Sequence, residues 1–141
     1  MSITVEDRIA IQELLGLYGH LIDQRRWDEL ADVFTDDIVF DATSFGQRVT
    51  TSYQELMGHW KSDETLHPRA HHVTNIVITE DADGTVRVSS KALGVGRKGR
   101  VGSATYEDIV VKTAGGWRLS RRVAILRRAD EPPAGPGGTE V

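Results

Sequence analysis

The spacing of apolar residues changes once along this chain, near His67 and Pro68, and the change restricts the folds that the chain can adopt. Before it, apolar side chains recur every three or four residues, which is the spacing of one face of a helix. After it, strand-forming residues dominate and short glycine-containing turns divide them. Helices followed by strands are typical of an α+β domain rather than of alternating βα units.

The first half of the chain predicts helices and one short strand. The first helix opens with Thr4 and Asp7, spaced as in a capping box, in which each side chain binds the other residue's backbone N–H. Each helix carries its apolar residues on one side, as helices that cover a core do. The expected helices cover residues 4–22, residues 27–34, and a stretch from residue 52 that reaches Trp60; the strand covers residues 38–40.

The second half predicts an antiparallel meander. Glycine-containing turn signals stand at residues 81–84, 98–99 and 115–116. Consecutive strands that are joined by such short turns run antiparallel. The expected strands cover residues 69–79, 85–97, 101–113 and 117–128.

A length of 141 residues suits one domain that buries its own core. We expect this domain to cover residues 1–128. Residues 129–141 hold three prolines and three glycines, with no large apolar residue before Val141. Such a segment has too little to bury, and we expect a disordered tail.

Composition excludes several classes of function. A formal net charge of −4 is not that of a nucleic-acid-binding protein, which needs a basic surface. No apolar run approaches the ~20 residues of a membrane span, and the pattern of a secretory signal is missing. The chain has no cysteine, which removes disulfides, thiol nucleophiles and cysteine zinc sites and fits a cytoplasmic location.

Two segments can carry chemistry. Asp23 lies where the first helix is expected to end, and His71 and His72 lie within an expected strand. Alternate strand residues face opposite sides, so only one of these two histidines can point into the protein. Taken alone, Asp23 is typical of a solvated capping residue and each histidine of a structural one. The three histidines His67, His71 and His72 do not have the spacing of zinc ligands, and we expect neither a metal nor a cofactor.

Several motifs, taken together, indicate membership of a known protein family. They are Tyr18-Gly-His-Leu-Ile-Asp23, Arg26-Trp27-Asp28-Glu29-Leu30, Phe34-Thr35-Asp36-Asp37, His71-x-x-x-Asn75, Tyr106-x-Asp108 and Gly116-Trp117-Arg118. The chain resembles the SnoaL-like branch of the nuclear-transport-factor-2-like superfamily, which includes polyketide cyclases, scytalone-type dehydratases and a dehydrochlorinase. The resemblance implies a cone in which three N-terminal helices wrap a curved antiparallel or mixed sheet around a deep pocket. It also implies a homo-oligomer, either a dimer or a trimer.

The resemblance also implies a catalytic pair. In similar enzymes an aspartate at the place of Asp23 pairs with a histidine at the place of His71. The carboxylate would orient the imidazole, and the imidazole would act as general base near pH 7 without a cofactor. His71 would share its strand face with Val73, Asn75 and Val77, and His72 would face away.

Further residues are assigned to substrate binding. Aromatic and apolar side chains are expected to line the pocket, although the same spacing is typical of plain core. For Asp108, a structural ion pair with Arg121 or Arg122 is the alternative. The expected set is Tyr18, Trp27, Phe40, Phe45, Met57, Trp60, Asn75, Tyr106 and Asp108.

One departure from the family narrows the chemistry. Where scytalone-type dehydratases hold a catalytic water with tyrosines, this chain has Ile22 and Ala42, so that water-assisted step is not expected. What remains is a lyase or isomerase that removes a proton from a small hydrophobic cyclic molecule. A non-catalytic binding domain and a small assembly subunit, like those of ring-hydroxylating dioxygenases, stay open because fold alone does not decide function.

Overall fold

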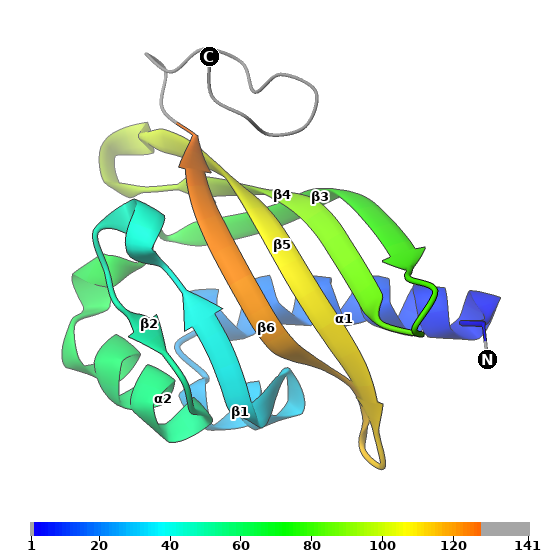
Figure 1. Cartoon of the computed structure of the whole chain (residues 1–141). Coiled ribbons are helices and arrows are strands. Elements are labelled where there is room, and N and C mark those ends of the chain that lie inside the picture. Colours follow the sequence, from blue (N-terminus) through cyan, green and yellow to red (C-terminus); the bar gives the residue numbers. More distant parts are fainter. Residues whose placement is uncertain (1, 128–141) are drawn as a thin grey trace.

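A curved six-stranded sheet and the long helix on its inner side form the frame of the molecule (Figure 1). The computed structural model describes residues 2–127, so the tail expected at 129–141 lies outside the described residues. The elements are α1 (Val5–Asp23), η1 (Trp27–Asp32), β1 (Phe34–Asp41), η2 (Thr43–Phe45), β2 (Val49–Thr50), α2 (Tyr53–Ser62), η3 (Glu64–Leu66), β3 (Ala70–Glu80), β4 (Val86–Val95), η4 (Arg97–Gly99), β5 (Val101–Thr113) and β6 (Gly116–Arg127). Elements labelled η are 3₁₀ helices.

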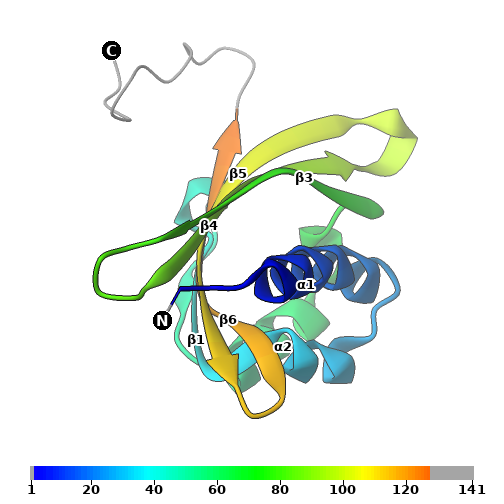
Figure 2. The same cartoon turned by 90° about the vertical axis from the view of Figure 1, so that its right-hand side faces the viewer.

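The sheet is mixed, with the strand order β2-β1-β6-β5-β4-β3. Strands β3 to β6 form the expected antiparallel meander. β1 joins β6 in parallel, and β2 pairs with β1 antiparallel. Figure 2 shows the sheet curving around α1. The expected α+β fold, with a curved mixed sheet and helices α1, η1 and α2, is confirmed.

α1 begins as its sequence predicts and packs closely on β3. The Thr4 hydroxyl accepts a hydrogen bond from the Asp7 backbone N–H at 3.0 Å, and Asp7 accepts one from Thr4 in return. A Cβ at Gly19 would lie 3.1 Å from the backbone oxygen of His71, so glycine at this position lets the helix approach the strand. In the described residues, no helix is long and apolar enough to cross a lipid bilayer.

The second helix differs from the expectation. The spacing predicts a helix up to Phe34, whereas η1 ends at Asp32 and β1 begins at Phe34. The Phe34 ring is buried and packs edge-on against Tyr18, with ring centroids 6.0 Å apart. Tertiary burial of this ring in the sheet outweighs the helical spacing of a short segment.

A β-bulge interrupts β3 and reverses its faces. The register with β4 shifts between Thr74 and Val77, and Asn75 has a left-handed φ of 55°. Beyond the bulge, Ile76 and Ile78 pack against the core while Val77 is 59% exposed. The expected grouping of Asn75 and Val77 with His71 is therefore wrong, because one extra residue moves every later side chain to the other face.

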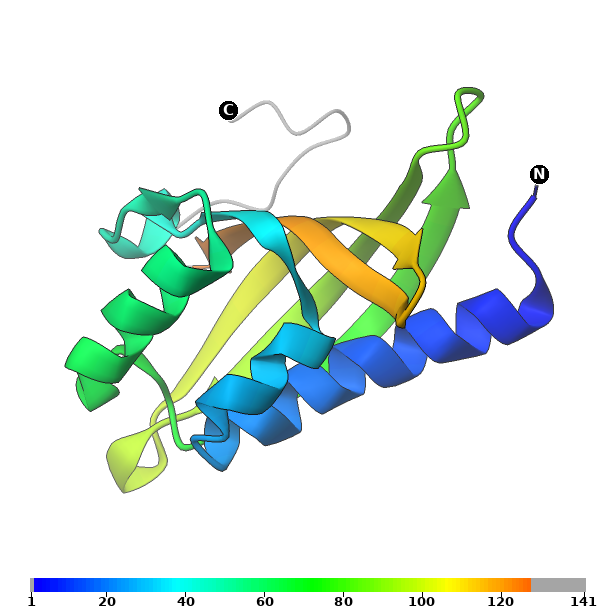
Figure 3. The ribbon, with the colours of Figure 1, turned by 90° about the horizontal axis from the view of Figure 1, so that it is seen from below.

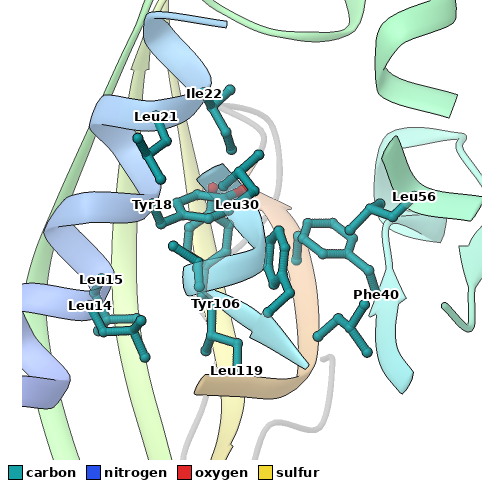
Figure 4. Close-up of a cluster of buried hydrophobic side chains, with 14 of the residues drawn as sticks. Leu14, Leu15, Tyr18, Leu21, Ile22, Leu30, Phe40, Leu56, Tyr106 and Leu119 are labelled. Atoms are coloured by element: carbon teal, nitrogen blue, oxygen red, sulfur yellow. The ribbon is translucent and has the colours of Figure 1, made fainter. Parts of the chain in front are cut away.

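The inner face of the sheet has a filled end and a hollow end. At the filled end, large side chains from α1 meet Tyr106 and Leu119 of the sheet, as Figure 4 shows. At the other end the inward-facing positions are small, namely Ala92, Gly94, Gly102, Ala104 and Ala124. Figure 3 shows α1 running along the sheet and α2 standing at the β1–β2 side. The small residues leave the space that the site occupies.

Candidate active site

Asp23 and His71 meet where α1 ends and β3 begins. The Asp23 Oδ1 atom lies 2.6 Å from His71 Nδ1. The same carboxylate accepts a hydrogen bond from the His71 backbone N–H, with distances of 3.1 and 3.0 Å to its two oxygens. The side chain of His71 is 7% exposed and that of Asp23 is 22% exposed. One carboxylate therefore holds both the strand and the imidazole in place.

This contact defines how the imidazole is protonated. A carboxylate accepts hydrogen bonds, so Nδ1 carries the proton and Nε2 keeps its lone pair. Burial lowers the pKa of His71, and Arg122 and Arg25 act in the same direction, while the hydrogen bond and charge of Asp23 only partly oppose them. The imidazole is thus neutral near pH 7 and can accept a proton at Nε2.

His71 faces a cavity of about 340 Å³. Its walls come from α1, β1, the segments around η2 and η3, and strands β3 to β6. They include Tyr18, Phe40, Phe45, Leu66, His67, Ala92, Ala104, Tyr106, Ala124 and Leu126. The cavity is mostly apolar, which strengthens electrostatic interactions within it.

Several of the residues expected at the site line this cavity. Besides His71, they are Tyr18, Phe40, Phe45 and Tyr106. Tyr18 lies on the buried stripe of α1 that the helical spacing predicts, and Phe40 and Tyr106 are buried on their strands, whereas Phe45 at the cavity wall is 41% exposed.

Other expected residues lie elsewhere. Met57 and Trp60 are buried in the core, and Trp27 packs against Trp60 with ring centroids 6.1 Å apart. Asn75 is exposed at the β3 bulge. These residues do not line the cavity: the aromatic ones form its supporting layer, and the bulge turns Asn75 outward.

Asp108 is also absent from the cavity wall, because it is engaged with Arg122 across β5 and β6. Arg122 donates from Nε and Nη2 to the two carboxylate oxygens at 2.8 and 2.7 Å, and both side chains are fully buried. Asp108 therefore forms the structural ion pair that the sequence analysis gave as the alternative to substrate binding. Burial disfavours the charged guanidinium, but Asp108 outweighs this and raises the pKa of Arg122.

Arg122 in turn holds the two cavity tyrosines. Its guanidinium carbon lies 4.2 Å from the ring centroid of Tyr18 and 3.9 Å from that of Tyr106. Cation–π contacts of this kind stabilise a buried guanidinium and fix the rings. Burial also raises the pKa of Tyr106 well above its usual range, so its phenol stays protonated and can donate a hydrogen bond.

His67 lines the cavity too, although sequence reasoning considered it only as a metal ligand. Its ring centroid lies 4.8 Å from that of Trp60 and 6.1 Å from that of His71. Burial, with the nearby charges of His71 and Arg25, lowers the pKa of His67 to about 3. The hollow end of the sheet does have a sequence signal, which is the alternation of small residues at Ala92, Gly94, Gly102 and Ala104.

Among residues 2–127, no group of three histidine, aspartate or glutamate side chains is placed to hold a metal ion. The His71 ring is engaged by Asp23, as described above. The described site offers an oriented imidazole beside an apolar cavity with two phenols.

Comparisons with known proteins agree on the fold. The family model of the SnoaL-like domain matches residues 4–123 of this chain. The chain is 32% identical over 126 residues to the uncharacterized protein Rv2910c of Mycobacterium tuberculosis, a match that covers 84% of each chain.

Solved structures are similar over most of their length. The Kfla4162 protein from Kribbella flavida has a TM-score of 0.69 and 26% identity, over 87% of this chain and 92% of that one. A cystatin-like protein of unknown function from Nostoc punctiforme has a TM-score of 0.77 and 21% identity, over 92% and 97% of the two chains. A Novosphingobium aromaticivorans protein provisionally named as a scytalone dehydratase has a TM-score of 0.68 and 22% identity, over 98% and 100%. The latter two show the fold alone.

Proposed function

The chain belongs to the family of SnoaL-like domains, and on that premise we propose that it is a cofactor-independent lyase or isomerase acting on a small hydrophobic cyclic molecule. The observation that carries the proposal is the 2.6 Å contact between Asp23 and His71 at the wall of an apolar cavity. This pairing resembles the aspartate-oriented imidazole of other proton-transfer enzymes, in which the carboxylate stabilises the imidazolium that forms. The proposal is therefore one of general base catalysis.

The proposed reaction starts at an acidic C–H bond of the bound ring. The Nε2 atom of His71 takes the proton, and the electrons of the C–H bond move into the ring. The phenols of Tyr18 and Tyr106 stabilise the charge that develops on a neighbouring carbonyl oxygen. In an elimination, a double bond forms and the leaving group departs with its electron pair; hydroxide takes the proton back from the imidazolium and leaves as water. In an isomerisation, the same proton returns to another carbon.

A screen of small cyclic hydroxy ketones and halogenated rings for loss of water or halide tests the proposal. Wild type should turn over at least one compound, and His71→Ala should lower kcat/KM by roughly 10²–10⁴-fold while the fold is retained. The matched control is His72→Ala, which removes the adjacent, exposed imidazole and should retain activity.

Two results would contradict the assignment. One is a folded His71→Ala protein with full activity. The other is a wild-type protein that binds these rings without turnover and without exchange of their acidic hydrogens for solvent deuterium, which is the behaviour of a binding domain.

A further inference from the structure

The β4–β5 turn forms one side of the cavity mouth and brings arginines to it. Inward-facing positions on β5 follow a period of two, and Arg100 continues the series Ala104 and Gly102 beyond the start of the strand. The Gly96 backbone N–H donates to the Arg100 oxygen at 2.7 Å, which closes the turn. Arg100 lines the 340 Å³ cavity directly.

Arg97 borders a second hollow next to the first. This hollow has a volume of about 270 Å³ and is lined by Thr65, Leu66, His67, Pro68, Gly96 and Arg97. It shares the segment 66–68 and Gly96 with the main cavity. A molecule that fills the cavity and extends past Gly96 would therefore meet both arginines.

These two cations have no carboxylate partner among the described residues. Among the side chains that the structure describes, which leave out that of Glu64, neither Arg97 nor Arg100 forms an ion pair, and both are exposed. The carboxylate of Asp63, near the second hollow, instead accepts hydrogen bonds from the Thr65 backbone N–H and hydroxyl. The interior cation Arg122 is neutralised by Asp108. The described side chains at the mouth thus contribute positive charge, although the chain carries a net charge of −4.

We propose that Arg97 and Arg100 form an anion-binding subsite, so that the cyclic substrate carries an anionic group, a carboxylate, sulfonate or phosphate, at the end that faces the β4–β5 turn. Guanidinium groups recognise such anions with paired hydrogen bonds. This inference deepens the proposed function. That the bound anion belongs to a substrate rests on the proposed function, whereas binding of the anion does not.

The sheet register gives the length of that substrate. His71 pairs with Gly94, and Gly94 pairs with Gly102, two residues from Arg100. Two inter-strand spacings of about 4.8 Å and two residues of about 3.4 Å place the backbones of His71 and Arg100 on the order of 12 Å apart. The reacting C–H and the anionic group therefore lie at opposite ends of a molecule of one or two rings.

The test uses two fluorescent probes of the same shape that differ in charge, anilinonaphthalene sulfonate and uncharged phenylnaphthylamine. Wild type should bind the sulfonate about tenfold more tightly, as expected for two exposed ion pairs, and salt should reduce the difference. In the double variant Arg97→Gln, Arg100→Gln the preference should vanish while the affinity for the uncharged probe is retained. The matched control is Arg87→Gln, at the opposite end of β4, which should keep the preference.

A third variant tests whether the probes bind in the cavity. A Cβ at Gly102 would meet no atom within 4 Å, so the backbone there accepts a side chain, and Gly102→Trp should fill the cavity and abolish binding of both probes. Equal affinity of wild type for the two probes, or a preference that survives in the double variant, would overturn the anion subsite and leave the catalytic pair untouched. Failure of the uncharged probe to bind, or binding that survives Gly102→Trp, would overturn the cavity as the ligand site and the proposed function with it.

Discussion

His67 and His71 lie on the same cavity wall, with ring centroids 6.1 Å apart, but their surroundings differ. His71 has the Asp23 carboxylate at Nδ1, whereas the buried Nε2 of His67 has no hydrogen-bond partner among the described residues. Burial lowers the pKa of both imidazoles, and only that of His71 is partly restored by a carboxylate. The two histidines thus differ: the imidazole of His71 is oriented by a carboxylate, and that of His67 has only its low pKa to keep it neutral.

This difference predicts how acid affects stability. The pKa of His67 falls from an ordinary value of 6.5 to about 3 in the folded protein. Below pH 6.5 the unfolded chain binds a proton that the folded protein does not, so the stability contributed by neutral His67 is present above pH 6.5 and is lost as pH falls towards 3.

Replacing His67 by phenylalanine should remove this loss, because the ring can still pack on Trp60 and cannot be protonated. Between pH values of about 7.5 and 4.5, wild type should lose on the order of 2–3 kcal/mol more unfolding free energy than His67→Phe, measured by urea denaturation. His72→Gln, the exposed control, should follow wild type. Equal pH dependence in wild type and His67→Phe would show that His67 is not held neutral.

At the scale of residues, the sequence predicted the Asp23–His71 contact but not the residues that surround it. Asp23 and His71 are 48 positions apart, and helical spacing alone places Asp23 away from the apolar stripe of α1. Only the resemblance to a family suggested the pairing. His67 was overlooked because its burial depends on Trp60, which lies on another element, and no local pattern reports that contact.

At the scale of elements, β3 shows how one residue changes a face. Asn75 adopts its left-handed φ at the bulge, and asparagine tolerates this conformation better than residues with a branched β-carbon. Asn75→Gly should keep or slightly raise the free energy of unfolding, whereas Asn75→Val should lower it by about 1–2 kcal/mol. Thermal or urea denaturation measures both.

Thr74→Val is the matched control for this prediction, since it places the same side chain on a regular strand position and should be nearly neutral. An Asn75→Val protein as stable as wild type would mean that β3 is regular. The register of β3 would then shift, and Ile76 and Ile78 would no longer face the core.

The bounds of the long elements were predictable, whereas those of η1 and β1 were not. α1 and β5 were expected within one residue of their observed bounds, because their periodicity extends over many residues. Phe34 was assigned to a helix because four apolar residues at helical spacing are too few to outweigh burial in a sheet. The bulge at Asn75 inserts one residue in β3, which an alternating pattern does not reveal in advance.

At the scale of the whole molecule, the buried core of the described residues lies within the domain that we expect to cover residues 1–128. All the buried hydrophobic side chains of residues 2–127 lie between Ile11 and Ala124. Truncation after Arg128 should therefore leave the Tm unchanged to within about 2 °C in a thermal scan. A fall of about 5 °C or more would mean that residues 129–141 contribute packing of their own.

The hollow end of the sheet gives the molecule its function in this account. Small residues on β4, β5 and β6 leave the cavity open, while α1 and β3 hold the base at its wall. The fold class was predictable from the order of helices and strands. The cavity was not located, because it arises where small inward positions on three strands meet, and only the tertiary pairing brings them together.

The most direct test of the central claim is the protonation state of His71, measured by nitrogen NMR of the histidine side chains and assigned with His71→Gln. We expect a neutral imidazole at pH 7 with its proton on Nδ1, a pKa below 6.5, and a change of tautomer in Asp23→Asn. A proton on Nε2, or an imidazole that remains protonated at pH 7, would contradict it, because His71 would then have no lone pair directed at the cavity.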